Sequence, residues 1–185
     1  MARVIHEFDP VERFVAGTVG EPGERSFFLQ ARSGARVVSV LLEKAQVLAI
    51  AERLNLLMKE LAKIEPKITS KFNGIPVEID DKPLEIPIME EFRVGIIGLA
   101  WVSDRELVQI DLQATTEENN ESDEIFGDED ESADVLRVLL SVAQTRSFVA
   151  RSFAVVASGR PPCPFCGLAL DPRGHICPRA NGYRR

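Results

Sequence analysis

The segment Phe14-Val-Ala-Gly-Thr-Val-Gly20 recurs later in the chain as Phe92-Arg-Val-Gly-Ile-Ile-Gly98, with the shared pattern F-x-x-G-x-x-G. A second pair follows in the same order, because Val40-Leu-Leu-Glu-Lys-Ala-Gln46 matches Val138-Leu-Leu-Ser-Val-Ala-Gln144 as V-L-L-x-x-A-Q. Two matches in register indicate a duplicated structural unit, whereas either match alone is weak. The sequence therefore predicts two similar units in one chain.

Each unit is predicted to contain three strands followed by a helix. In the first unit, residues 13–19, 26–32 and 36–42 show alternation or β-branched runs, and turn residues separate them. Apolar residues at helical spacing then predict a helix over residues 43–63. In the second unit, the same reasoning predicts strands at 92–102, 106–114 and 134–140. Its helix is predicted to begin at the capping box Ser141-x-x-Gln144 and to end at Gly159.

These patterns predict an α+β fold, in which two duplicated β-β-β-α units form a mainly antiparallel sheet with two packed helices. The units are expected at residues 1–63 and 92–159, and a C-terminal zinc-knuckle tail at 160–185. Residues 64–91 contain four prolines and are expected to form a connector, with an extra hairpin around Asp80-Asp81. The glycines of F-x-x-G-x-x-G lie within strands or at their ends, so they indicate bulges or close strand contacts rather than a nucleotide loop.

Charge is strongly segregated along the 185 residues, whose formal net charge is −7. Ten acidic residues and no basic residue lie between Glu117 and Asp134, so the rest of the chain is slightly basic. Such a run cannot build a core, and we expect a solvated acidic loop over residues 117–132. The acidic balance disfavours a general nucleic-acid binder. No signal peptide or bilayer-length apolar run is recognisable, so a cytoplasmic protein is expected.

The C-terminal tail carries all three cysteines and one of the two histidines of the chain. Cys163-Pro-Phe-Cys166-Gly167 has the form of a zinc knuckle, because two thiolates two residues apart can hold one ion and the glycine permits a left-handed turn. His175-Ile-Cys177 follows eight residues later. Together these residues predict a Cys₃His structural zinc site with the ligands Cys163, Cys166, His175 and Cys177.

Two other interpretations of the cysteines stay open. Cys-Pro-Phe-Cys also resembles a glutaredoxin-like redox pair, but that chemistry favours a first cysteine at the start of a helix. The prolines before Cys163 and the glycine after Cys166 indicate a loop instead. A catalytic metal is the other alternative, although a complete Cys₃His shell has no open position for water or substrate.

The sequence favours a non-catalytic binding or adaptor protein, because no phosphate loop, nucleophile elbow or Ser/His/Asp set is present. Arg179, Arg184 and Arg185 are candidates for binding an acidic protein surface or a phosphorylated ligand. One alternative is an enzyme or ligand-binding domain whose pocket, between the repeats, takes a phosphate-containing ligand. Another is weak nucleic-acid binding through the Arg-rich tail. The chain gives no indication of a membrane partner. Whether it forms a homo-oligomer stays an open question.

The segment Arg13-Phe-Val-Ala-Gly-Thr-Val-Gly-Glu-Pro-Gly-Glu-Arg-Ser-Phe-Phe-Leu-Gln30 and the Cys/His tail together resemble an uncharacterised family. That family is catalogued as a domain of unknown function or "repeat protein", mainly from high-GC Gram-positive bacteria. The similarity extends over nearly the whole chain, and the tail motif is specific. The resemblance implies the duplicated architecture and a bacterial origin, and it implies no activity.

Overall fold

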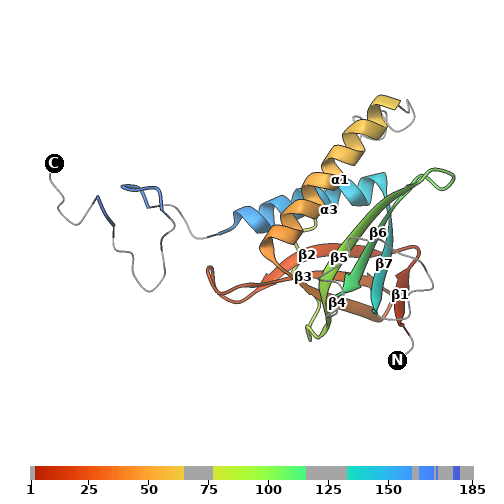
Figure 1. Cartoon of the computed structure of the whole chain (residues 1–185), viewed down its shortest axis with the longest axis horizontal. Helices are drawn as coiled ribbons and strands as arrows, with labels where there is room; N and C mark the ends of the chain where they lie inside the picture. Colours follow the sequence, from red (N-terminus) through yellow and green to blue (C-terminus); the bar gives the residue numbers. More distant parts are fainter. Residues whose placement is uncertain are drawn as a thin grey trace.

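The computed structural model describes residues 3–64, 77–115, 133–159, 163–168, 170 and 177–179. Its body is a seven-stranded mixed sheet with two helices (Figure 1). The elements in chain order are β1 (Ile5–Phe8), β2 (Arg13–Val19), β3 (Ser26–Ser33), β4 (Arg36–Leu42), α1 (Lys44–Ile64), β5 (Glu90–Val102), β6 (Leu107–Ala114), β7 (Val135–Ser141) and α3 (Val142–Ala157).

The predicted fold class is confirmed, and the β-β-β-α succession occurs twice, as β2-β3-β4-α1 and as β5-β6-β7-α3. That the two units arose by duplication stays a prediction. Strand β1 was not predicted, because it has only four residues and its one partner, β7, lies more than 120 positions away in the sequence. The predicted acidic loop, residues 117–132, lies outside the described residues.

The strand order is β1-β7-β6-β5-β4-β3-β2. Four of the six pairings are antiparallel, and β4–β5 and β1–β7 are parallel, so the mainly antiparallel sheet is confirmed. Although β1 and β2 form opposite edges, only residues 9–12 connect them, a link that reaches at most about 17 Å. The sheet therefore curls until its edges approach each other, and Arg36 of β4 donates to the Glu7 carbonyl of β1 at 2.8 Å.

Both helices pack against one face of the sheet, where most of the apolar core lies (Figure 1). Helix α1 buries the predicted stripe, which includes Val47, Ile50, Leu54, Met58 and Leu61. The ring of Phe148 in α3 stacks on that of Phe14 in β2, with 4.8 Å between the centroids. Neither α1 nor α3 is long and apolar enough to cross a membrane.

The glutamines of the V-L-L-x-x-A-Q repeat make the same pair of hydrogen bonds. Gln144 accepts from the Ser141 N–H at 2.9 Å and donates to the Val11 carbonyl at 2.8 Å. Gln46 accepts from the Glu43 N–H at 2.9 Å and donates to the Val94 carbonyl at 3.1 Å. Each glutamine thus caps the start of its helix and connects that helix to another segment of the body by a hydrogen bond.

The glycines of F-x-x-G-x-x-G serve backbone geometry, as expected. A Cβ on Gly17 would lie 2.6 Å from Leu84, which crosses the face of the sheet opposite the helices. Gly95 sits at the bulge between Val94 and Ile96, where the register of β5 against β6 shifts. In both places a larger side chain would displace a neighbour.

The predicted hairpin at Asp80-Asp81 is wrong, because residues 77–89 contain no strand. Asp80 instead receives two hydrogen bonds from Arg13, at 2.6 and 3.0 Å, and one from Arg151 at 3.3 Å. Arg151 is buried and also donates to the carbonyls of Ala16 and Lys82, at 2.6 and 2.8 Å. Paired charges, rather than strand pairing, therefore fasten the connector to the body.

Candidate metal centre

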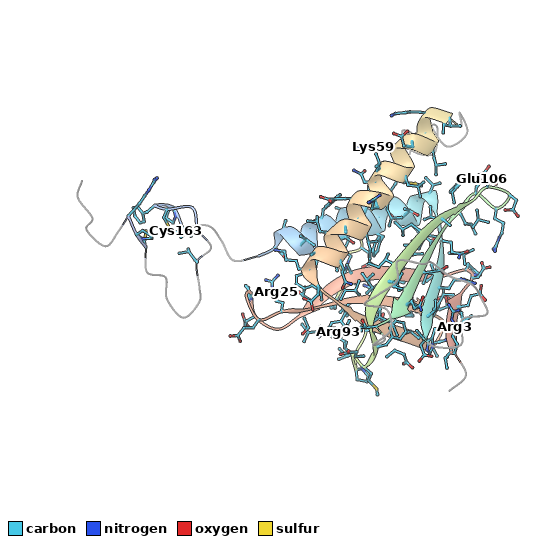
Figure 2. All side chains as sticks on the ribbon, viewed as in Figure 1. Arg3, Arg25, Lys59, Arg93, Glu106 and Cys163 are labelled. Carbon is cyan, nitrogen blue, oxygen red and sulfur yellow. The ribbon has the colours of Figure 1, made fainter. Side chains whose placement is uncertain are left out.

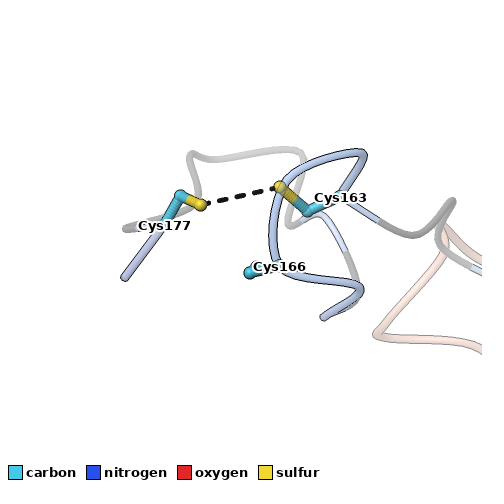
Figure 3. A group of neighbouring side chains, drawn as sticks. All are labelled: Cys163, Cys166 and Cys177. Carbon is cyan, nitrogen blue, oxygen red and sulfur yellow. Dashed lines mark hydrogen bonds between the residues drawn. The ribbon is translucent and has the colours of Figure 1, made fainter. Parts of the chain in front are cut away.

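The structure brings three of the four predicted ligands together (Figure 3). The sulfur atoms of Cys163, Cys166 and Cys177 all lie within 4.8 Å of one another, and those of Cys163 and Cys177 are 3.8 Å apart. The side chains of Cys163 and Cys177 are buried, with residue exposures of 4% and 6%. The fourth predicted ligand, His175, lies outside the described residues.

Local backbone geometry explains how the first two cysteines converge. Gly167 has φ of +75°, the left-handed conformation predicted for the residue after the knuckle. Its N–H donates to the Cys163 carbonyl at 2.8 Å, and the Cys163 N–H donates to the Leu168 carbonyl at 2.7 Å. These bonds close a tight loop with both thiols on it, and Cys177 approaches from a separate segment.

The loop also favours the thiolate form of Cys163. A hydrogen bond from the Cys166 backbone N–H, helped by one from Phe165, lowers the pKa of Cys163 to about 6. Burial raises the pKa of Cys166, although a backbone hydrogen bond from Leu168 acts in the opposite direction. The lowered pKa favours the thiolate form of Cys163 at neutral pH, and the thiolate is the form in which cysteine binds a metal ion.

The donor set fits a zinc ion. Zinc–sulfur bonds of about 2.3 Å in a tetrahedron place two sulfurs about 3.8 Å apart, which is the distance between Cys163 and Cys177. A disulfide would require about 2.05 Å. Thiolates select soft or borderline ions such as zinc over magnesium or calcium.

The redox interpretation is weakened by the surroundings of Cys163. Helix α3 ends at Ala157, and residues 164–166 form a turn. No helix begins at Cys163 within the part of the tail that the structure describes. The third thiol, Cys177, has no role in a simple two-cysteine pair, whereas it belongs to a group of three thiols that could hold a metal ion.

The structure also shows an exposed surface on the loop that sequence reasoning missed. Phe165 is 63% exposed and Leu168 is 56% exposed, beside the buried cysteines. Arg179 donates from Nη1 to the Phe165 carbonyl at 3.2 Å, which places this predicted partner-binding residue next to the loop. The other two, Arg184 and Arg185, lie outside the described residues. The spacing of the cysteines fixes the loop, but only the folded backbone shows which side chains point outward.

Comparison with known protein families shows which family the chain belongs to. A family model described as "Protein of unknown function (DUF3090)" matches residues 6–177. The chain belongs to the DUF3090 family. No curated protein and no solved structure matches it. The region shared with DUF3090 runs from β1 through Cys177, so it includes both the body and the whole cysteine cluster.

Proposed function

We propose that this DUF3090 protein is a non-catalytic binding or adaptor protein whose C-terminal tail is folded by one structural zinc ion. The convergence of three thiols from two segments carries the proposal. His175 completes a Cys₃His set on the basis of its spacing. A structural zinc ion with four protein ligands cross-links the chain and has no free coordination position for a substrate.

The knuckle loop is proposed as the contact surface. The side chains of Phe165 and Leu168 are exposed on this loop, and the cysteines fix its backbone. Arg179 contacts the same loop. Aromatic and arginine side chains are enriched among residues that dominate binding energy. Arg184 and Arg185 extend the positive charge of the tail. This chemistry suits an acidic protein surface or a phosphorylated ligand.

The metal is tested by elemental analysis of the full chain purified without chelator. We expect close to one zinc per chain, and loss of most of it in Cys177→Ser and His175→Ala. Phe165→Ser is the matched control in the same loop, and it should keep its zinc. A chain without metal, with Cys163 and Cys166 oxidised to each other, would contradict the proposal and favour the redox interpretation.

The contact surface is tested by photo-crosslinking in the native cells, with a photoreactive amino acid at position 165. We expect a discrete crosslinked partner that disappears when Cys177→Ser is added. A probe at Leu56 on α1 is the control, because that residue is 54% exposed, against 63% for Phe165. Capture of the same partner from position 56, or capture that survives loss of the metal, would show that the loop is not the contact.

A further inference from the structure

A cavity of about 470 Å³ lies where the two β-β-β-α units meet. One wall comes from the turn between β2 and β3 and from the start of α1, and the other comes from the end of α3. The lining residues are Pro22, Gly23, Arg25, Phe27, Lys44, Val156, Ala157 and Gly159. It is larger than the cavity of about 90 Å³ beside Asp80. Its volume lies within the range of small-molecule sites.

The charged residues in this lining are two cations, Arg25 and Lys44. Arg25 donates from Nη1 to the Ser158 hydroxyl at 3.1 Å, which holds the guanidinium at the cavity. The Nζ atom of Lys44 lies 3.9 Å from the position that a Cβ on Gly159 would occupy, so the ammonium reaches the same wall. Two cations of the first unit, one on the β2–β3 turn and one at the start of α1, thus converge on a space whose opposite wall comes from α3 of the second unit.

Arg25 is half-buried and Lys44 is exposed, and both differ from the buried basic groups of the body in their charge partners. Arg13 and Arg151 share the Asp80 carboxylate, and their cavity is correspondingly neutralised. Arg25 and Lys44 have no carboxylate partner within the described residues. Glu43, which precedes Lys44, instead pairs with Arg93 at 2.9 Å. The positive charge at the cavity is therefore available to a ligand.

The rest of the lining is largely apolar. Phe27 is buried at the base of the turn, and Val156 and Pro22 add aliphatic surface. A fully hydrated ion would gain nothing from these side chains, whereas an organic group attached to an anion would bury apolar area against them. Two convergent cations favour a dianion over a monoanion, and arginine binds phosphate oxygens in bidentate fashion.

From this arrangement we propose that the cavity binds a small organic phosphate monoester, with the phosphate between Arg25 and Lys44 and the organic group against Phe27 and Val156. This site is separate from the cysteine cluster and does not depend on the metal. It gives the protein a ligand-binding function in its body, in addition to the binding function proposed for the tail.

The test is calorimetric titration of the full chain with phenyl phosphate, the probe that combines both features. We expect a dissociation constant below about 1 mM, and at least tenfold weaker binding in the double variant R25Q/K44Q. Lys59→Gln is the matched control, because Lys59 is an exposed cation near the far end of α1 (Figure 2) and should leave the affinity unchanged. Phenol should not bind, since it lacks the anion.

A second variant separates the cavity from general surface charge. Ala157→Leu adds bulk to the lining, keeps both cations and suits the end of a helix. We expect it to weaken phenyl phosphate binding at least tenfold while its melting temperature stays that of the wild type. Binding that survives Ala157→Leu, equal binding by R25Q/K44Q, or no binding by the wild type up to about 10 mM would each overturn the proposal.

Discussion

The body and the tail of this protein are held together by different physical means. In the body, side chains such as Leu29, Leu54 and Ile110 are fully buried in one continuous apolar core. In the described part of the tail, the buried side chains are Cys163 and Cys177, whereas Phe165 and Leu168 are exposed and Leu170 is half-buried. Burial of apolar side chains therefore stabilises the body, whereas it contributes little in the described part of the tail.

With the zinc ion proposed above, this difference predicts two independent sources of stability. A core of this kind contributes through the apolar area that it removes from water. A loop of a few residues cannot bury such an area, and small zinc modules gain their folding free energy from the metal instead. In Figure 1 the tail segments lie beyond the end of α3, apart from the sheet. Changes that unfold one region should accordingly spare the other.

Metal removal should have the largest effect, and it should be confined to the tail. Structural zinc contributes on the order of 10 kcal/mol in small modules, so chelation or Cys177→Ser should unfold the knuckle completely. Limited proteolysis should then cut after residue 159 at least about a hundredfold faster. A hundredfold change in rate corresponds to only a small part of the free energy that the metal contributes. The thermal transition of the body should move by less than about 2 °C.

Phe165→Ser serves as the control for this experiment, because it alters the loop without removing a ligand. Its proteolysis rate should stay within about threefold of the wild type. If chelation lowered the melting temperature of the body as much as a core mutation does, the two regions would share one source of stability and the comparison would fail.

A core substitution should show the reverse pattern. Leu54→Ala leaves a cavity on the buried side of α1, within the apolar core, and should lower the free energy of unfolding of the body by about 3 kcal/mol. Zinc content per chain should not change. Leu56→Ala removes the same atoms from the exposed side of α1 and should cost less than about 0.5 kcal/mol. Denaturant unfolding measures both values.

Loss of the Asp80 charge, which holds the connector to the body, should have an intermediate effect on the free energy of unfolding. This effect should depend on pH. Asp80→Asn removes the charge that faces the buried Arg151, and it should cost about 2 kcal/mol at pH 7. The hydrogen bond from Arg13 lowers the pKa of Asp80 below the ordinary value of an aspartate. The stabilisation by the ionised form is therefore complete above about pH 5 and decreases as the pH falls below about 4.

Unfolding free energies measured from pH 7 to pH 2.5 test this prediction. The difference between the wild type and Asp80→Asn should be constant above about pH 5 and should shrink on acidification. Asp104→Asn makes the same charge change at an exposed position and should cost less than about 0.5 kcal/mol at pH 7. A difference for Asp80→Asn that grows at low pH would contradict the role assigned to its ionised carboxylate.

The sequence predicts what depends on local patterns. The strands and helices of both units, the capping box and the convergence of the knuckle cysteines all follow from periodicity or short spacing. Pairings between distant segments were missed. Strand β1 depends on β7, and Asp80 is bonded to Arg13 and Arg151 at separations of 67 and 71 residues.

The candidate sites follow the same division. The spacing C-x₂-C is local, so the closeness of Cys163 and Cys166 was predictable, whereas the exposure of Phe165 is a property of the folded loop. The cavity between the units combines Arg25 and Lys44 with residues more than 110 positions away. A pocket at that junction was predicted only in general terms, because composition and periodicity do not show which side chains converge.

The smallest predicted effect compares the two helix starts within the body. At α3, the Ser141 hydroxyl accepts from the Gln144 N–H at 3.2 Å, so Ser141→Ala should cost about 1 kcal/mol. At the same place before α1 stands Glu43, whose side chain instead forms an exposed ion pair with Arg93. Glu43→Ala should therefore cost less than about 0.5 kcal/mol. Equal costs in denaturant unfolding would show that the cap hydroxyl contributes nothing, and that the repeated glutamines, Gln46 and Gln144, alone close both helices.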